Sequence, residues 1–187
     1  MKYPYSAERE VRTYEYLRKA AVDALEKAKS IEEGSFYQLI SSLVFSAFAV
    51  EAYLNHVGEH KIQYWGEIEK IEPMAKLKVL YSHLNLQFDP SKRPIQTIRQ
   101  LFKFRNFMAH GRTENLVGSG TLNKPAPDPG ENLVETDWEK FCNKQKAGRA
   151  IEDVKEVLET LCVAAGFEKI KLYSLGSASR VVQAPQP

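Results

Sequence analysis

Apolar residues recur along most of this chain at the three-to-four-residue spacing of amphipathic helices, interrupted by Gly, Pro and polar clusters. Ser6 is placed to cap the first helix, and prolines stand in the first turns of the third and fourth. The pattern predicts helices over residues 7–31, 35–57, 73–86, 94–111 and 136–165, the last with a break near Gly148. Residues 64–72 are expected to form a connector or short helix. We therefore expect an all-α, up-and-down bundle of four to five helices.

Between residues 112 and 136 the helical spacing is lost, and Gly, Pro, Asn and Asp become frequent. This segment is expected to be a long loop inserted before the last helix, with room for a small hairpin. Thr136 and Glu139 match the S/T-x-x-E capping box, which predicts the start of the last helix. Residues 1–170 are thus expected to form one helical domain, and residues 171–187 a flexible tail.

The composition permits a sizeable core, because 43% of the residues are hydrophobic. The formal net charge of +2 creates no strong field around the whole molecule, so binding of nucleic acid would depend on a local basic patch. Cys142 and Cys162 belong to no CxxC or Cys/His cluster. This favours free thiols in a reducing compartment over a zinc site or a disulfide framework.

Two stretches of the sequence bear on location. The first residues are charged and aromatic and contain no apolar segment typical of a secretion signal. Residues 36–50 are apolar for about fifteen positions before Glu51, short of the roughly 20 needed to cross a bilayer. We therefore expect a soluble, cytoplasmic protein without a membrane partner, in which this segment is a buried helix.

Two charged residues fall where the apolar pattern of their helices predicts the core. On an ideal helix Arg105 lies roughly 20° from Ile98, in the middle of the apolar stripe. Glu51 likewise lies inside the apolar arc of residues 35–57. An unpaired buried charge costs several kcal/mol. We expect Glu51 and Arg105 either to approach each other or to face a shared, water-filled cleft.

A second face of the helix over residues 94–111 is polar, and it carries Gln96, Arg99, Lys103, Asn106 and His110. Two cations, an amide and an imidazole in a row are suited to holding a phosphodiester. A solvated helix face is the simpler explanation of such a stripe. Arg105 and His110 diverge by roughly 140° on an ideal helix. They would converge if the last turn loosens or if a second copy of the chain supplies one of them.

The segment RNFMAH, residues 105–110, fits the R-x4-6-H signature of HEPN domains, including the asparagine directly after the arginine. The segment SAFAVEAYLNH, residues 46–56, is similar to the small-residue-rich helix of that family, with Glu51 as its acidic residue. Over residues 35–111 the chain therefore resembles a HEPN domain. The resemblance implies a helical bundle that commonly forms a homodimer with one shared cleft. It also implies either metal-independent RNA cleavage, as in toxin–antitoxin or phage-defence systems, or binding of RNA or nucleotides without cleavage.

As an endoribonuclease of this kind, the protein would be a toxin or defence effector that needs neither a metal nor a cofactor. His110 would act as general acid or base, and Arg105 would stabilise the charge of the phosphorane. Asn106 would orient the substrate or the imidazole, and Glu51 would hold Arg105. The 2′-OH of RNA would attack its own phosphate and leave a 2′,3′-cyclic phosphate and a 5′-hydroxyl. The candidates for contacts to backbone phosphates are Arg99, Lys103 and Arg112.

Three observations keep other interpretations open. HEPN toxins silenced by a nucleotidyltransferase carry a tyrosine at the position of Arg112, so modification by that route is not expected here, and an antitoxin remains a possible partner. The same residues fit a non-catalytic HEPN-like module for RNA or nucleotides, or a helical dimerisation scaffold with a buried Glu51–Arg105 pair. His56 and His60 lack a third ligand, which makes them exposed histidines rather than a metal site.

Overall fold

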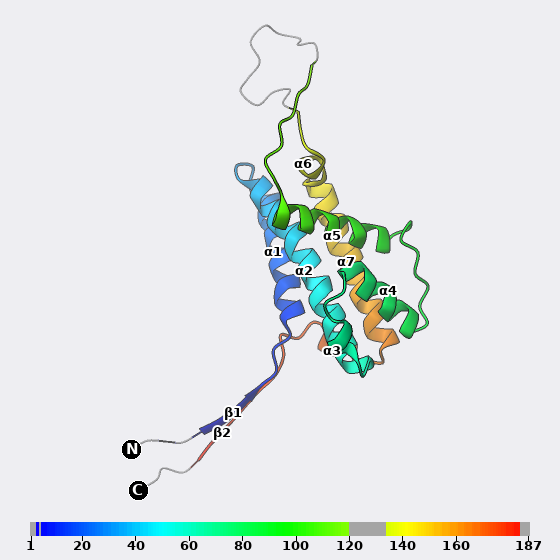
Figure 1. The fold of residues 1–187 in the computed structure, drawn as a ribbon. Helices are drawn as coiled ribbons and strands as arrows, with labels where there is room; N and C mark the ends of the chain where they lie inside the picture. The colour runs from blue at the N-terminus through cyan, green and yellow to red at the C-terminus, as the bar shows by residue number, and fades with distance from the viewer. Residues whose placement is uncertain (1–2, 4, 120–133, 184–187) are drawn as a thin grey trace.

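The computed structural model describes residues 3, 5–119 and 134–183, and the structural statements below concern these residues (Figure 1). The described part of the chain is mostly α-helical, as predicted, with five long helices, three short ones and one two-stranded sheet. In chain order the elements are β1 (Tyr5–Arg9), α1 (Thr13–Ser30), α2 (Ser35–Lys61), α3 (Trp65–Ile68), α4 (Pro73–His83), α5 (Ile95–His110), α6 (Asp137–Phe141), α7 (Lys144–Ala164), α8 (Lys169–Leu172) and β2 (Ala178–Val182).

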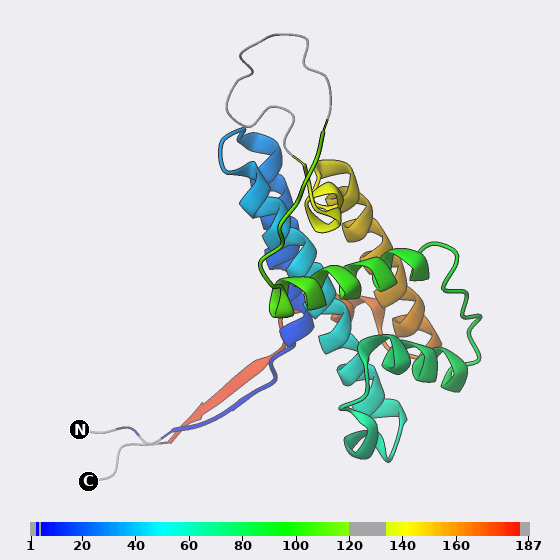
Figure 2. The same cartoon turned by 45° about the horizontal axis from the view of Figure 1, so that its top comes forward.

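Helix α2 is the centre of the bundle. It packs against α1 and α7 along its length and also contacts α4 and α5 (Figure 1). Its fully buried residues include Leu43, Val50 and Leu54, which join Ile98 and Leu101 of α5 in one hydrophobic core. Helix α5 crosses over α2 instead of running alongside it, as the turned view shows (Figure 2). This crossing places one turn of α5 above the middle of α2.

Helix α2 is also long and apolar enough to cross a membrane by length and composition alone. Half of its most apolar window is buried inside the bundle, however. A helix surrounded by neighbours reads as hydrophobic on all sides. The apolar composition of α2 is therefore accounted for by its central position, as expected for residues 36–50.

Several helix ends differ from the predicted ones. Helix α2 continues past Gly58 to Lys61, and α4 ends at His83 instead of residue 86. The capping box of Thr136 is present, as predicted, because its hydroxyl accepts from the Glu139 N–H and the Glu139 carboxylate accepts from the Thr136 N–H. It opens only the short α6, since the break falls at Asn143, which caps α7, and not near Gly148. Cys142 and Cys162 are buried free thiols.

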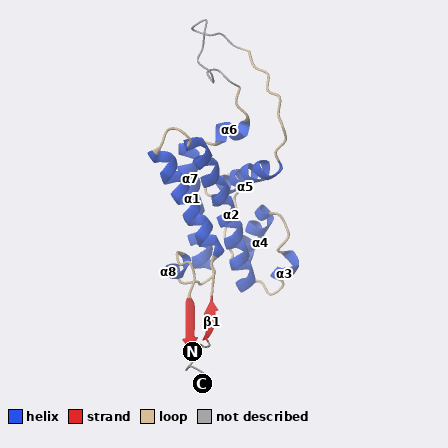
Figure 3. Cartoon of the chain, turned by 90° about the vertical axis from the view of Figure 1, so that its left-hand side faces the viewer, coloured by secondary structure: helices blue, strands red, loops and turns tan. Residues whose placement is uncertain are grey.

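Both ends of the described chain differ most from the prediction. Residues 7–12 do not start the first helix, and Ser6 is not its cap, because Tyr5–Arg9 forms β1 and α1 begins at Thr13. Where a flexible tail was predicted, the structure has α8 and then β2. The two strands pair antiparallel, with Ala7 opposite Arg180, and project from the bundle as a narrow arm (Figure 3). The predicted hairpin between residues 112 and 136 falls largely outside the described residues, and the described parts of that loop contain no strand.

Gly58 is a point of close packing, and it yields a stability prediction. A Cβ at Gly58 would lie 2.2 Å from the indole ring of Trp65, which is itself buried. We expect Gly58→Ala to lower the free energy of unfolding by about 2 kcal/mol, because overpacking a filled core forces neighbours to shift. Urea unfolding followed by circular dichroism measures this value.

The matched control for that prediction is Gly148→Ala in α7, where an added Cβ meets nothing within 4 Å. Alanine is the better helix former by about 0.5–1 kcal/mol, so this variant should be slightly more stable than the parent. Equal effects of the two substitutions would contradict the packing of Trp65 on Gly58.

Candidate functional site

The crossing of α5 over α2 brings together the two charges that the apolar pattern singles out. An Nη of Arg105 donates to the carboxylate of Glu51, and the other Nη donates to the Asn106 side-chain oxygen over 2.8 Å. Neither partner is freely solvated, since the Glu51 side chain is 26% exposed and that of Arg105 is 17% exposed. The expected approach of Glu51 and Arg105 is thus present in the structure.

Arg105 is also held by its aromatic neighbours. Its guanidinium lies 5.6 Å from the ring centroid of Phe48 and 6.0 Å from that of Phe102. A cation placed over aromatic faces gains electrostatic attraction and is shielded from water. The Arg105 Nε is buried and has no hydrogen-bond partner within the described part of the protein. The guanidinium is therefore fixed in place without all of its donors being used.

A third charge, Lys76 of α4, was missed in the sequence. Its side chain is only 5% exposed, and its Nζ lies 3.4 Å from Glu51 and 3.0 Å from the Asn55 oxygen. Glu51 is thus shared between two cations, and the cluster of Glu51, Lys76 and Arg105 carries one net positive charge. The helical spacing does indicate that Lys76 is near the core, because it lies roughly 40° from Leu80 on an ideal helix, beside the buried stripe of α4.

His110 is exposed at the last residue of α5. The helix remains regular to that point, so the last turn does not loosen as one of the sequence interpretations required. No hydrogen bond or ion pair between described residues joins His110 to Arg105. Asn106 lies four residues before His110 and therefore on the same side of the helix. The structure brings Glu51, Arg105 and Asn106 together, while His110 stands next to Asn106 at the helix end.

The predicted phosphate contacts lie around α5 on its solvent side. Arg99 and Lys103 are exposed on the helix, and Arg112 is exposed in the segment that follows it. Lys103 borders a cavity of about 510 Å³ between α5, α6 and the segments at both ends of the loop. Its other lining residues include Phe107 and Trp138, whose rings stack, and three carboxylates. None of Glu51, Lys76 and Arg105 lines this cavity, and its three carboxylates disfavour a phosphate, so we locate the candidate site at the Glu51 cluster.

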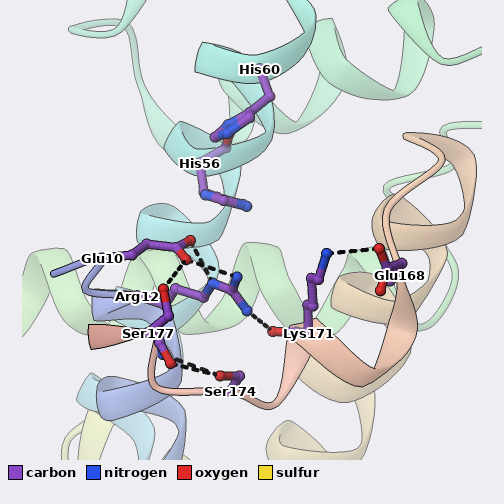
Figure 4. A network of polar contacts seen from close by, with 9 residues as sticks. Glu10, Arg12, His56, His60, Glu168, Lys171, Ser174 and Ser177 are labelled. Atoms are coloured by element: carbon purple, nitrogen blue, oxygen red, sulfur yellow. Dashed lines mark hydrogen bonds and ion pairs between the residues drawn. The ribbon is translucent and has the colours of Figure 1, made fainter. Parts of the chain in front are cut away.

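His56 and His60 lie in the last two turns of α2, beside the base of the arm (Figure 4). His60 is exposed as expected, but His56 is half-buried among Tyr14, Tyr53 and Phe167. The expectation of two exposed histidines is therefore wrong for His56, because α2 continues beyond residue 57 and keeps its ring against the core. No group of three His, Cys, Asp or Glu residues suited to a metal occurs in the described ranges.

Burial, together with the neighbouring His60 and Arg12, lowers the pKa of His56 to about 4, whereas Glu10 acts in the opposite direction. A histidine whose pKa is lower in the folded than in the unfolded chain stabilises the fold fully above the unfolded value near 6.5. That stabilisation is lost as the pH falls from 6.5 toward 4. One pKa unit corresponds to about 1.4 kcal/mol. After allowance for the partly exposed ring, we expect a loss on the order of 2 kcal/mol.

The measurement is urea unfolding from pH 8 down to pH 4.5 with the parent and His56→Gln. The variant should lack the part of the pH dependence assigned to His56, whereas His83→Gln, at an exposed histidine, should retain it. Superimposable curves for the parent and His56→Gln would contradict the assignment.

Comparison with models of protein families, with curated protein sequences and with solved structures found no match to this chain.

Proposed function

We propose that the protein is a HEPN-like, metal-independent endoribonuclease that acts as a toxin or defence effector in the cytoplasm. The observation that carries the proposal is the Glu51–Arg105 ion pair, with Asn106 on the second branch of the guanidinium. These three residues are the acidic, arginine and asparagine positions of the two segments that resemble the HEPN family. A purely structural pair of the same kind exists between Arg93 and Asp153, but it lacks an adjacent amide and histidine.

The charge balance of the cluster supports an anionic ligand. Lys76 and Arg105 together outweigh Glu51 by one positive charge, at positions only partly open to water. A poorly solvated cation gains more from an incoming anion than an exposed one does. A phosphodiester carries one negative charge and several acceptor oxygens, which match a guanidinium with unused donors.

The proposed chemistry uses the nucleophile that RNA carries. A neutral His110 takes the proton of the 2′-OH as the oxygen attacks phosphorus, and the P–O bond to the 5′-oxygen breaks. A protonated imidazole gives its proton to the leaving 5′-oxygen. Arg105 donates to the non-bridging oxygens, where negative charge accumulates in the transition state. The products are a 2′,3′-cyclic phosphate and a 5′-hydroxyl, and no oxidation state changes.

The exposed position of His110 has a consequence for this mechanism. Two imidazoles in opposite protonation states are needed, and each chain has one at the end of α5. In the proposed homodimer the second copy supplies the other, so the cleft contains two sets of Arg105, Asn106 and His110. Asn106 would then position the histidine of its own chain against the phosphate beside Arg105.

The test uses the purified protein and single-stranded RNA in the presence of EDTA. Cleavage products should end in a 2′,3′-cyclic phosphate, and His110→Ala should cut about 100-fold more slowly, since loss of general acid–base catalysis has that magnitude. His83→Ala removes an exposed histidine outside the cluster and should cut like the parent. An uncut RNA, or equal rates for the parent and His110→Ala, would refute the proposal.

One observation favours a second candidate, an RNA- or nucleotide-binding module without catalysis. His110 makes no described contact with Arg105, so the cluster as it stands suits anion binding better than proton transfer. In that case RNA would bind without being cut, and its affinity would fall as salt rises because counterions are released on binding. Arg105→Gln would weaken such binding, while His110→Ala would leave it largely intact.

A further inference from the structure

The two-stranded arm stands apart from the bundle, yet its base is firmly attached. Arg12 donates to both carboxylate oxygens of Glu10 and to the backbone carbonyl of Lys171, so it ties the start of the arm to α8 (Figure 4). Gly176 is required at this point, because its φ is +119° and a Cβ would lie 2.1 Å from the Glu10 carbonyl oxygen. These contacts fix the orientation of the arm relative to the bundle at its base, while all ten residues of β1 and β2 are exposed.

The hydrogen bonds at the base determine which backbone groups of β1 are free. The N–H of Glu10 donates to Ser177 over 2.9 Å, and that of Arg12 donates to Leu175 over 3.1 Å. In an antiparallel pair, residues alternate between facing the partner strand and facing away from it. Ser6 and Glu8 therefore face β2, whereas Tyr5, Ala7 and Arg9 direct their N–H and C=O groups to the open edge.

We propose that the open edge of β1 binds the same edge of a second copy of this chain, giving a four-stranded antiparallel sheet. This inference rests on the geometry of the arm and does not depend on the nuclease proposal. An isolated two-stranded ribbon is at best marginally stable in water, and an exposed edge invites pairing with another chain. A twofold axis perpendicular to the sheet would relate the two copies.

The sequence of β1 fits one register of this pairing better than the others. With Ala7 opposite Ala7 of the second copy, Tyr5 faces Arg9 twice, and Glu8 faces Ser6. All free groups of Tyr5, Ala7 and Arg9 are then used, in about six hydrogen bonds between the strands. A shift that centres the pairing on Glu8 would oppose two carboxylates, and one centred on Ser6 would leave Arg9 without a partner in β1.

Side chains on the same face support this register. Tyr5 already has the guanidinium of Arg180 at 5.2 Å from its ring, so it lies on the face that carries the arginines. In the paired sheet, Arg9 of the second copy would approach the same ring from the other side. Opposite aromatic and cationic residues stabilise neighbouring strands, and opposite charges of like sign destabilise them.

The other edge of the arm is less suited to self-pairing. By the same alternation, Ala178, Arg180 and Val182 of β2 direct their backbone groups outward. The register that uses all three of them places Arg180 opposite Arg180. Like charges directly opposite each other are unfavourable, so the sheet should close at β1 and end at β2.

The experiment is sedimentation velocity of the full chain over a dilution series, without RNA. The parent should have twice the mass of Ala7→Pro, because proline removes the central outward N–H and with it the contact through β1. Any contact between the bundles at α5 would be present in both proteins. Proline is tolerated on an edge strand where that N–H faces solvent, so the bonds between β1 and β2 remain. The matched control is Ala178→Pro, which makes the same change at the outer edge of β2 and should keep the mass of the parent.

A second variant covers the case in which Ala7→Pro disturbs the arm itself. Arg9→Glu keeps the backbone but places a carboxylate beside Glu8 and removes both Tyr5–Arg9 contacts between the copies. Its dimer should dissociate about tenfold more readily than that of the parent. A monomeric parent, or a dimer that survives both Ala7→Pro and Arg9→Glu, would overturn the proposal. Loss of the dimer in Ala178→Pro would overturn it as well, by placing the contact at β2.

The outcome is separable from that of the nuclease proposal. Arg105 and His110 lie on α5, away from the arm (Figures 1 and 3), so their variants should not change dimerisation through β1. A parent that dimerises through the bundle alone, and so keeps its mass in Ala7→Pro, would refute pairing through β1. The outcome of the RNA assay would not be affected. An arm that associates only when RNA is added, with loss in both Arg9→Gln and Arg180→Gln, would assign it to nucleic acid instead and so overturn the proposal.

Discussion

Replacing Arg105 with glutamine is expected to slow RNA cleavage about 1,000-fold, because a preorganised donor to the developing charge is removed. The fold should tolerate the change. Glu51 retains a cationic partner in Lys76, whose Nζ lies 3.4 Å from its carboxylate. Initial rates on a short RNA in EDTA measure the effect, and urea unfolding shows that the variant remains folded.

Arg93→Gln is the matched control for Arg105→Gln. It also breaks an arginine–carboxylate pair, since the Arg93 guanidinium lies 2.7 Å from the buried Asp153. That pair links α7 to the segment before α5 and lies outside the Glu51 cluster. Arg93→Gln should therefore cost stability and keep its cleavage rate. If both variants lost activity in proportion to their stability, Arg105 would have no special part in the reaction.

Glu51→Ala, unlike Arg105→Gln, should lower the free energy of unfolding substantially. Without the carboxylate, Lys76 and Arg105 face each other across the cluster as two poorly solvated cations. Removal of one member of a buried ionic group costs about 3–5 kcal/mol, and the partial exposure of Glu51 places this case near 3 kcal/mol. Equilibrium unfolding in urea measures the loss.

Two further variants test the cause of that loss. Glu152→Ala removes a carboxylate that is 76% exposed on α7, and its effect should stay within about 0.5 kcal/mol. Combining Glu51→Ala with Lys76→Met removes one of the two stranded cations and should restore part of the lost stability. If the two changes were simply additive, charge repulsion would not explain the effect of Glu51→Ala.

The helical pattern predicts the core elements because each long helix carries enough apolar residues to define its own buried face. The helical positions of Glu51 and Arg105 place both charges among apolar residues. Because an unpaired charge in the core is costly, this predicts either that they approach each other or that they share a water-filled cleft, and the structure has the first. Lys76 escaped notice because α4 is short, and a lysine at the margin of an apolar stripe usually extends into solvent. Here its ammonium is bound by Glu51 and Asn55, on a helix distant in sequence.

The arm was missed for a different reason. Residues 5–9 contain a serine, an alanine and two charges, which read equally well as the first turn of a helix. Their strand conformation comes from pairing with residues 178–182, more than 160 positions later. Local patterns carry no information about such a partner. The helix ends at Lys61 and Asn143 likewise depend on tertiary packing and capping, which shift boundaries by a few residues.

His110 is the final residue of α5, so its backbone is directly connected to the segment that leaves the helix at Gly111. A terminal helical residue frays more easily than an interior one, and its orientation follows whatever holds the chain just beyond it. A partner or ligand that binds residues 112–119 would thus also restrict the orientation of the His110 imidazole, the proposed proton-transfer group. The orientation of Arg105 would be unaffected, because its guanidinium is bound to Glu51 of α2.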